Sequence, residues 1–307
     1  MKRLFYIIVA AFAMICPLQS CANGGGAKTE VSAPESAASP EIAESAEPAE
    51  SAKPAESAKK PNYKIRIESL LKDAKQQKSS TNFPLFFARQ FLDVPYVAHT
   101  LEVNDEEQLV INTDELDCTT LVETVTALTL CAYRKTFTFL DYQNVLKAMR
   151  YRHGVIDRYP SRIHYFTDWI VENTQAGIVT EIQQPNPPFT QIQTVKVNYM
   201  SQHPQSYKAL KAHPEFVAEI AQMEQRLTGQ KFRFIPKSCV KDTPAMREAV
   251  HDGDIIAITC NKPGLDIAHL GFAVWRNDGL HLLNASQLHK KVVEEPMTLY
   301  QYLQKHP

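Results

Sequence analysis

The chain has 307 residues, a net charge of −1 and 44% hydrophobic residues. A chain this close to neutral has no electrostatic reason to bind a polyanion, which argues against a nucleic-acid-binding protein. Its length is enough for one sizeable folded domain with shorter segments attached.

Residues 1–20 are typical of a lipoprotein signal peptide. Lys2 and Arg3 precede an apolar run over residues 4–15, and Cys21 follows soon after. We predict cleavage before Cys21 and lipidation of that cysteine, which gives a membrane-anchored protein facing the periplasm. The alternatives are an ordinary secretory signal or an uncleaved anchor, although the apolar run is shorter than the roughly 20 residues that span a bilayer.

The next segment, residues 21–61, consists mainly of Ala, Glu, Ser, Pro and Lys and contains near-repeats such as AESAEPAESAKPAESA. It has no aromatic residue and cannot form a hydrophobic core, so we predict a disordered tether. The folded part of the chain is then residues 62–307, where functional residues are to be sought.

Cys118 lies where a polar turn leads into a predicted helix. Apolar residues recur at helical spacing after it, namely Leu121, Val122, Val125, Leu128 and Cys131. Unpaired N–H groups at a helix start favour a thiolate, so a lowered pKa and a nucleophilic Cys118 are expected. The alternative is a cysteine that only packs as a small hydrophobic residue.

Four runs near the C-terminus predict successive strands, at residues 253–260, 268–275, 280–286 and 291–295. Turn residues separate them, which favours an antiparallel sheet following a helix and so an α+β fold. The sequence Asn277-Asp278-Gly279 predicts a hairpin with a two-residue Asp-Gly loop, in which Asn277 pairs with Leu280.

In that register His269 shares a face with Asn284, whereas His281 points to the other face. Asn284 is therefore the better candidate to orient the imidazole of His269. Asn284 would lie opposite Ala273, about 13 Å along the sheet from His269, so coiling or a bulge must close the gap. Either residue could instead be structural, because strand histidines are often simply packed and asparagine often begins a turn.

The remaining cysteines give no sign of a metal site. None of Cys118, Cys131, Cys239 and Cys260 shows CxxC or Cys/His zinc spacing. Cys131 is expected in the core. Cys239 and Cys260 could pair in an exported protein, but the sequence leaves this open.

The order of cysteine, histidine and polar residue is that of papain-like enzymes. The motifs LDCTTLVE, AHLGFAVW and LLNAS, with PYVAHTLE before them, resemble those of the NlpC-type cell-wall cysteine hydrolases. SRIHYFTDWI, at residues 161–170, and FIPKS before a strand beginning with Gly-Asp are similar to the N-acetylmuramoyl-L-alanine amidase-like branch. The resemblance spans nearly all of residues 62–307.

The resemblance implies a papain-like fold with the catalytic helix packed on an antiparallel sheet. It makes Cys118 the nucleophile, His269 the base and Asn284 the orienting residue, and it places Tyr96 near the oxyanion or the substrate. No cofactor is required. Thr119 stands where serine is usual, and asparagine replaces the frequent histidine at position 284, but its carbonyl oxygen can still accept the imidazole N–H.

The distance from Cys118 to His269 exceeds that of a minimal family domain, so we predict a helical and loop insertion at about residues 136–236. Within it lies a cluster of aromatic and polar residues suited to binding sugars and peptides, namely Arg162, His164, Tyr165, Asp168 and Trp169. The alternative is a half-buried helix whose aromatic residues face the core.

These features together imply a peptidoglycan or muropeptide hydrolase that cuts the amide between N-acetylmuramic acid and L-alanine. The γ-D-glutamyl bond to the diamino acid of the stem peptide is the close alternative. Acyl transfer to an acceptor other than water would use the same residues. A non-catalytic wall-binding lipoprotein is the alternative from another class of protein.

Overall fold

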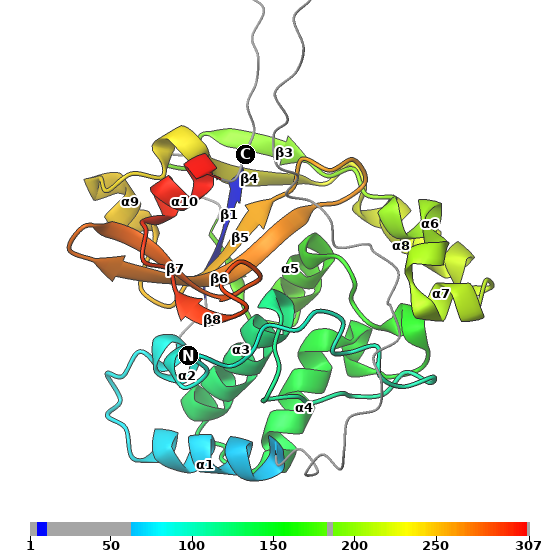
Figure 1. The fold of residues 1–307 in the computed structure, drawn as a ribbon, viewed down its shortest axis with the longest axis horizontal. Coiled ribbons are helices and arrows are strands. Elements are labelled where there is room, and N and C mark those ends of the chain that lie inside the picture. Colours follow the sequence, from blue (N-terminus) through cyan, green and yellow to red (C-terminus); the bar gives the residue numbers. More distant parts are fainter. Residues whose placement is uncertain (1–4, 11–62, 183–186, 306–307) are drawn as a thin grey trace, which may run out of the picture.

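The structure is a computed structural model that describes residues 5–10, 63–182 and 187–305. It is an α+β fold in which a group of helices packs beneath a twisted sheet (Figure 1). Cys21 and the predicted tether lie outside the described residues. No helix within the described ranges is long and apolar enough to cross a bilayer.

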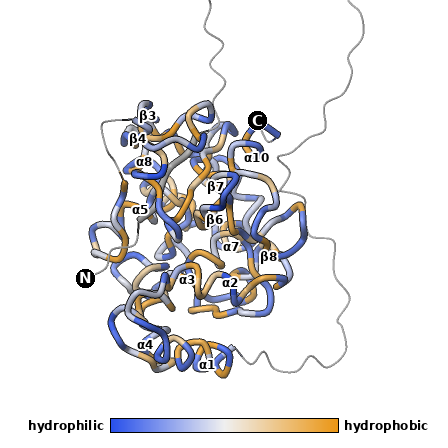
Figure 2. Tube along the Cα trace, turned by 90° about the vertical axis from the view of Figure 1, so that its left-hand side faces the viewer, coloured by the Kyte–Doolittle hydropathy of each residue, from blue (hydrophilic) through white to orange (hydrophobic). Residues whose placement is uncertain are grey.

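Five helices form the group beneath the sheet. They are α1 (Tyr63–Lys75), α2 (Phe83–Arg89), α3 (Cys118–Arg134), α4 (Phe139–Arg150) and α5 (Phe166–Gln175). Hydrophobic and hydrophilic residues alternate along α1, as expected for a helix buried on one face (Figure 2). Its buried positions, Ile67, Leu70, Leu71 and Ala74, have the three- and four-residue spacing of such a face.

Helix α3 is the central element of this group. It is buried from Thr120 to Ala132, because apolar and small residues occupy nearly every position. Its start is defined by a capping box, in which Asp117 accepts from the backbone N–H of Thr120 and the Thr120 hydroxyl accepts from that of Asp117. The predicted helix is confirmed, and Cys131 is in the core as expected.

Within the described residues the sheet has eight strands. They are β1 (Phe5–Ala10), β2 (Thr180–Glu181), β3 (Gln191–Thr194), β4 (Lys231–Pro236), β5 (Ile255–Thr259), β6 (Ile267–Arg276), β7 (Gly279–Ser286) and β8 (Lys291–Glu294). The order is β3-β4-β1-β5-β6-β7-β8, and β2 pairs with β1. Strands β5 to β8 form the predicted antiparallel ladder, whereas β1 runs parallel to β2, β4 and β5.

Strand β1 lies within the segment that the sequence predicts to be a leader. It pairs with β5 from Tyr6–Ile255 to Val9–Ile258 and with β4 at Val9–Ile235. A mature chain that begins at Cys21 would lack this strand. Removal of the leader remains a prediction.

The register predicted for the β6–β7 hairpin is wrong. Arg276 pairs with Gly279, so the two-residue loop is Asn277-Asp278 instead of Asp278-Gly279. Gly279 has a φ of +136°, which favours glycine, and it adopts this angle as the first residue of β7 instead of inside the loop. The shift brings Asn284 two residues closer to His269 along the sheet.

The predicted insertion at residues 136–236 holds helices and loops, but also strands that extend the sheet. After α4 and α5 come β2, β3, α6 (Tyr199–Gln202), α7 (Lys208–Ala212), α8 (Phe216–Leu227) and β4. Short 3-10 turns are η1 (Arg152–Gly154), η2 (Tyr159–Ser161), η3 (Pro204–Ser206) and η4 (Lys237–Cys239). The sequence analysis did not predict β2, β3 or β4.

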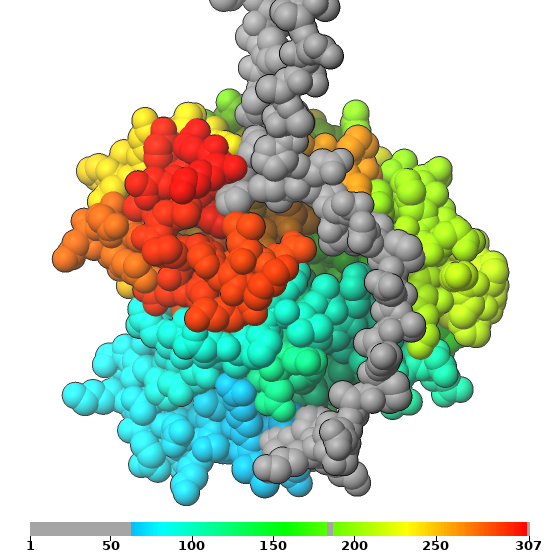
Figure 3. Space-filling model, in the orientation of Figure 1, coloured from blue at the N-terminus to red at the C-terminus, as the bar shows by residue number. Residues whose placement is uncertain are grey.

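Two further helices cover the other side of the sheet, α9 (Pro244–Ala249) and α10 (Leu299–Lys305). Figure 3 shows the C-terminal segment, in red, against the orange segment that holds β7 and β8. Leu299 and Leu303 of α10 share a hydrophobic cluster with Leu280 and Leu282 of β7. This packing places α10 next to the strands that carry the predicted catalytic residues.

Candidate active site

Cys118 is the first residue of α3, and its side chain meets strand β6. The backbone N–H groups of Leu270 and Thr119 donate to its sulfur. Leu270 directly follows His269 in the chain, so this contact puts the sulfur beside the strand position of the predicted base. The capping box at Asp117 fixes where the helix begins and so where Cys118 lies.

The expected lowering of the Cys118 pKa is not what the structure shows. Although the residue keeps some contact with solvent, desolvation of the sulfur and then the nearby charge of Asp117 raise the pKa of Cys118 to about 12. The N–H of Leu270 and the hydroxyl and N–H of Thr119 oppose this shift without overcoming it. The resting thiol is therefore neutral, and the chemistry needs a base that removes its proton during attack.

The charge of Asp117 can be tested separately from its capping role. Asparagine caps a helix as well as aspartate does, so Asp117→Asn keeps the helix start and removes a negative charge beside the sulfur. Because that charge raises the thiol pKa, its loss lowers the pKa and increases the thiolate fraction at any given pH. We expect alkylation of Cys118 by iodoacetamide at pH 8 to become about threefold to tenfold faster.

The measurement is the mass of the peptide that carries Cys118 after timed alkylation between pH 6 and pH 10. Asp114→Asn is the matched control, because Asp114 is an exposed carboxylate in the same loop and is not among the causes of the shift. Equal alkylation profiles for Asp117→Asn and the wild type would refute the electrostatic role of Asp117.

His269 and Asn284 are brought together as the sequence predicts. The Nε2 atom of His269 lies 3.0 Å from Oδ1 of Asn284. Continuing the observed β6–β7 ladder by one pair sets Asn284 opposite Gly271, about 7 Å along the strand from His269 instead of 13 Å. A register shift between β5 and β6 at Ile258, where Ala268 is the extra residue, adds a local irregularity beside His269.

Gly271 lies between the two residues, where the strands approach closely. A Cβ at this position would lie 2.7 Å from the carbonyl oxygen of Leu283 and 2.7 Å from a methyl carbon of Leu282. Any side chain would therefore push β6 and β7 apart next to the His269–Asn284 contact. Glycine is required here by space alone.

The amide of Asn284 is itself oriented by a buried carboxylate that sequence reasoning missed. Asn284 donates from Nδ2 to Oε1 of Glu295 at 3.1 Å, and Glu295 is only 1% exposed. The other carboxylate oxygen of Glu295 lies 3.2 Å from Nε2 of His289. With its NH₂ group directed at Glu295, Asn284 turns its oxygen toward His269.

This orientation assigns the protons of the imidazole ring. The Asn284 oxygen can only accept, so Nε2 of His269 carries the hydrogen and donates it. In the neutral ring, Nδ1 of His269 is then the unprotonated nitrogen that can act as a base. Glu295 has a sequence signal, a charged residue at the end of a predicted strand, but nothing in the sequence shows that it is buried.

Two tyrosines lie close to the sulfur. Tyr96 belongs to a segment bridged to Leu116 on one side and hydrogen-bonded to the carbonyl of Lys290 on the other. Burial, then the charges of Cys118 and Asp117, raise the pKa of Tyr96, so its hydroxyl remains a donor at neutral pH. Tyr302 of α10 stacks on His269 with ring centroids 6.4 Å apart, a contact that the sequence analysis missed.

The predicted substrate-binding cluster is mostly buried, which corrects two of its assignments. Trp169 is 1% exposed and stacks on Phe166 with ring centroids 4.8 Å apart. Tyr165 is 3% exposed and donates its hydroxyl to Glu224. Residues so buried cannot stack on a sugar ring, because the aromatic face of α5 packs into the core, as the alternative interpretation expects.

Arg162 and His164 also have internal partners. Arg162 is buried and forms ion pairs with Glu102 and Glu107. His164 packs on the ring of Tyr159 and forms a hydrogen bond with the backbone carbonyl oxygen of Tyr159. Burial, and then the charge of Arg162, lowers the pKa of His164 to about 3. His164 is therefore neutral at physiological pH. Both side chains are thus engaged by partners within the fold.

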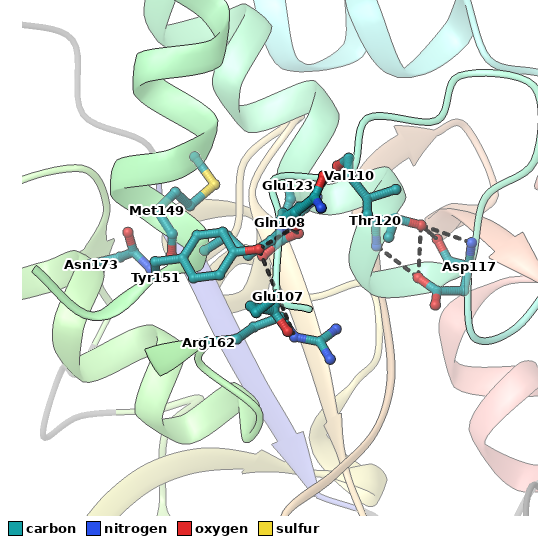
Figure 4. Close-up of polar contacts among 11 residues, drawn as sticks. Glu107, Gln108, Val110, Asp117, Thr120, Glu123, Met149, Tyr151, Arg162 and Asn173 are labelled. Carbon is teal, nitrogen blue, oxygen red and sulfur yellow. Dashed lines mark hydrogen bonds and ion pairs between the residues drawn. The ribbon is translucent and has the colours of Figure 1, made fainter. Parts of the chain in front are cut away.

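These internal contacts hold the loop that leads to Cys118. Tyr151 donates its hydroxyl to Glu107 and to the carbonyl of Gln108, as Figure 4 shows beside the Asp117–Thr120 cap. Further along the loop, Arg150 donates to the carbonyl of Val110 and pairs with Glu123 in the second turn of α3. The loop before the cysteine is thus tied to α3 and to the residues after α4.

Among the residues described, the cysteines and acidic residues outside this site form neither a disulfide nor a metal-binding cluster. Cys239 and Cys260 are both free thiols. No group of three or more His, Cys, Asp or Glu side chains within the described ranges is placed to hold a metal ion.

The site unites a thiol at a helix start with a histidine that an amide orients, an arrangement that suits nucleophilic acyl transfer. The family model described as N-acetylmuramoyl-L-alanine amidase-like, or AmiA-like, matches residues 86–307. The chain belongs to this family. The match supports the amidase-like branch of the resemblance, while the wider NlpC-type relationship and its papain-like fold remain predictions.

The chain is also similar to solved structures. An N-acetylmuramoyl-L-alanine amidase from Bacteroides uniformis is 42% identical, with a TM-score of 0.68, over 73% of this chain and 92% of that one. A Bacteroides fragilis structure provisionally named a xylanase is 41% identical, with a TM-score of 0.66, over 71% and 93%.

A Legionella pneumophila structure is 21% identical, with a TM-score of 0.59, over 80% and 89% of the two chains, and it shows the fold alone. No curated protein matches the chain.

Proposed function

We propose that the protein is a peptidoglycan hydrolase that cleaves the amide bond between N-acetylmuramic acid and L-alanine, with Cys118 as nucleophile. The observation that carries the proposal is the contact of the Cys118 sulfur with the N–H of Leu270, next to a His269 that Asn284 orients. The 42% identity to a protein named N-acetylmuramoyl-L-alanine amidase supports the choice of bond.

In the first half of the proposed reaction, Nδ1 of His269 takes the thiol proton as the sulfur of Cys118 attacks the carbonyl carbon of the amide. Because the thiol pKa is high, proton transfer accompanies attack instead of preceding it. The backbone N–H of Cys118 and the hydroxyl of Tyr96 are the candidate donors to the oxyanion. The C–N bond then breaks, and His269 gives its proton to the leaving amine.

The second half releases the acyl group. His269 removes a proton from water, which attacks the thioester carbonyl, and the C–S bond breaks to restore the thiol. Through its ordered hydrogen bond to Nε2, Asn284 stabilises the imidazolium that forms in each half. A lipid on Cys21 and the tether that follows it would hold this site close to a polymer outside the membrane.

The bond is identified by the masses of the products from N-acetylmuramoyl-L-alanyl-γ-D-glutamyl-diamino acid. We expect free N-acetylmuramic acid and an intact tripeptide. The tripeptide without the sugar is the control substrate and should stay uncut. Release of muramyl dipeptide would instead identify the γ-D-glutamyl endopeptidase and overturn the proposed bond. Absence of any cleavage would favour the wall-binding alternative.

A further inference from the structure

His281 is a buried histidine that the proposed reaction does not use. It belongs to β7, is 0% exposed and lies on the opposite face of that strand from Asn284. Its Nδ1 lies 2.8 Å from the backbone carbonyl oxygen of Glu295, and its Nε2 lies 2.9 Å from Oδ1 of Asp278. Both ring nitrogens therefore have a partner, one just after β8 and the other in the β6–β7 loop.

The two partners determine the hydrogens on this ring. A backbone carbonyl oxygen can only accept a hydrogen bond, so Nδ1 of His281 donates to Glu295. The bond from His281 is the main cause of the lowered pKa of Asp278, which is therefore ionised at neutral pH and accepts from Nε2. With a hydrogen on each nitrogen, His281 is an imidazolium whose charge is balanced by Asp278.

Glu295 is the residue whose backbone His281 holds. The N–H of Glu295 donates to the carbonyl oxygen of Leu282 at 2.8 Å, and its carbonyl oxygen accepts from His281. Since β8 ends at Glu294, these two bonds continue the pairing with β7 for one more residue. They fix the backbone from which the carboxylate of Glu295 projects toward Asn284.

A row of contacts then runs from His281 to the proposed base. The carboxylate of Glu295 accepts from Nδ2 of Asn284 at 3.1 Å, and Oδ1 of Asn284 lies 3.0 Å from Nε2 of His269. A shift of the Glu295 backbone would break the first of these contacts and free the amide to turn its NH₂ group toward His269. The imidazole would then carry its hydrogen on Nδ1, which could no longer take the thiol proton.

We propose that His281 is a positioning residue for the reaction, because it fixes Glu295 so that Asn284 presents only its oxygen to His269. The bond from Nδ1 carries this role, whereas the bond to Asp278 holds the ring itself. The effect on cleavage rests on the proposed function. The effect on the tautomer of His269 does not.

Two amide variants separate the two nitrogens of His281. The NH₂ group of asparagine lies near the position of Nδ1, whereas that of glutamine reaches toward the position of Nε2. His281→Gln should lose the bond to Glu295 and lower kcat about tenfold with little change in KM. His281→Asn should keep that bond and restore kcat to within about threefold of the wild type. The measurement is tripeptide release from N-acetylmuramoyl-tripeptide by the full chain, with thermal unfolding of each variant.

The ¹⁵N chemical shifts of the His269 imidazole give a second readout that needs no cleavage. His269→Gln identifies the signals of this ring among those of the 10 histidines. In the neutral ring of the wild type and of His281→Asn we expect the hydrogen on Nε2 alone. His281→Gln should show a mixture of the two tautomers, because the amide of Asn284 is no longer fixed.

Glu295→Leu tests the next contact in the row if His281→Gln does not fold. Leucine cannot accept from Asn284, so His269 should again show both tautomers. A single tautomer with the hydrogen on Nε2 in either variant would overturn the proposal. So would equal losses of kcat in His281→Asn and His281→Gln, because His281 would then only stabilise the fold.

The two proposals fail separately. A changed tautomer in His281→Gln without muropeptide cleavage by the wild type would refute the proposed hydrolase and keep the positioning role. Cleavage by the wild type with an unchanged tautomer in His281→Gln would do the reverse.

Discussion

Replacing Cys118 by alanine should reduce cleavage of N-acetylmuramoyl-tripeptide by roughly 10⁴-fold or more, because no other group in the site can form the thioester. The fold should be unaffected, since Cys118 is partly exposed and the capping box at Asp117 and Thr120 does not involve its side chain. The measurement is the initial rate of tripeptide release, with thermal unfolding recorded on the same preparations.

Cys239→Ala is the matched control for this substitution. Cys239 is also a partly exposed free thiol. It lies in η4, which directly follows β4, and strands β1 and β5 separate β4 from β6 in the sheet. It should keep wild-type activity. Retained activity in Cys118→Ala would exclude the cysteine mechanism and leave the family assignment intact.

The second large effect is expected at His269. His269→Gln removes the base that a thiol with a pKa of about 12 requires, so kcat should fall roughly 10³-fold or more. Asn284→Ala acts only through the orientation of that imidazole and should lower kcat by about 10²-fold with little change in KM. The readout is the separation of kcat from KM for the same muropeptide.

A double variant tests whether Asn284 works through His269. If it does, His269→Gln with Asn284→Ala should be no slower than His269→Gln alone, because the two residues act as one unit. His251→Gln is the control, since His251 is largely exposed and bonds no residue of the site. Fully additive losses would show that Asn284 has an independent role.

The local elements were predictable because their signals are local. Helical spacing after Cys118 and four apolar runs between turn residues predict α3 and β5 to β8 correctly. The pairing of β6 with β7 also follows from a turn signal, but its register does not. Several loop conformations suit Asn277-Asp278-Gly279, and each sets a different pairing of the same two strands.

Residues 162–169 show why amino-acid composition alone cannot predict a binding site. Aromatic and polar residues at 162–169 suit either a cleft or a core, and periodicity cannot tell which face of α5 is covered. Packing against the neighbouring helices buries Trp169 and Tyr165, while Glu102 and Glu107 engage Arg162. Of the residues around the sulfur in the structure, Leu270 lies in the AHLGFAVW motif, whereas Tyr302 belongs to none of the motifs found in the sequence.

The sequence by itself predicted the candidate catalytic residues: a cysteine at a helix start, then a histidine and an asparagine on adjacent strands. Only the tertiary structure decided the state of those groups. Burial and Asp117 set the protonation of the thiol, and the amide orientation depends on Glu295. The reason is that residue type and spacing are properties of the chain, whereas desolvation and hydrogen-bond direction arise from distant segments meeting in space.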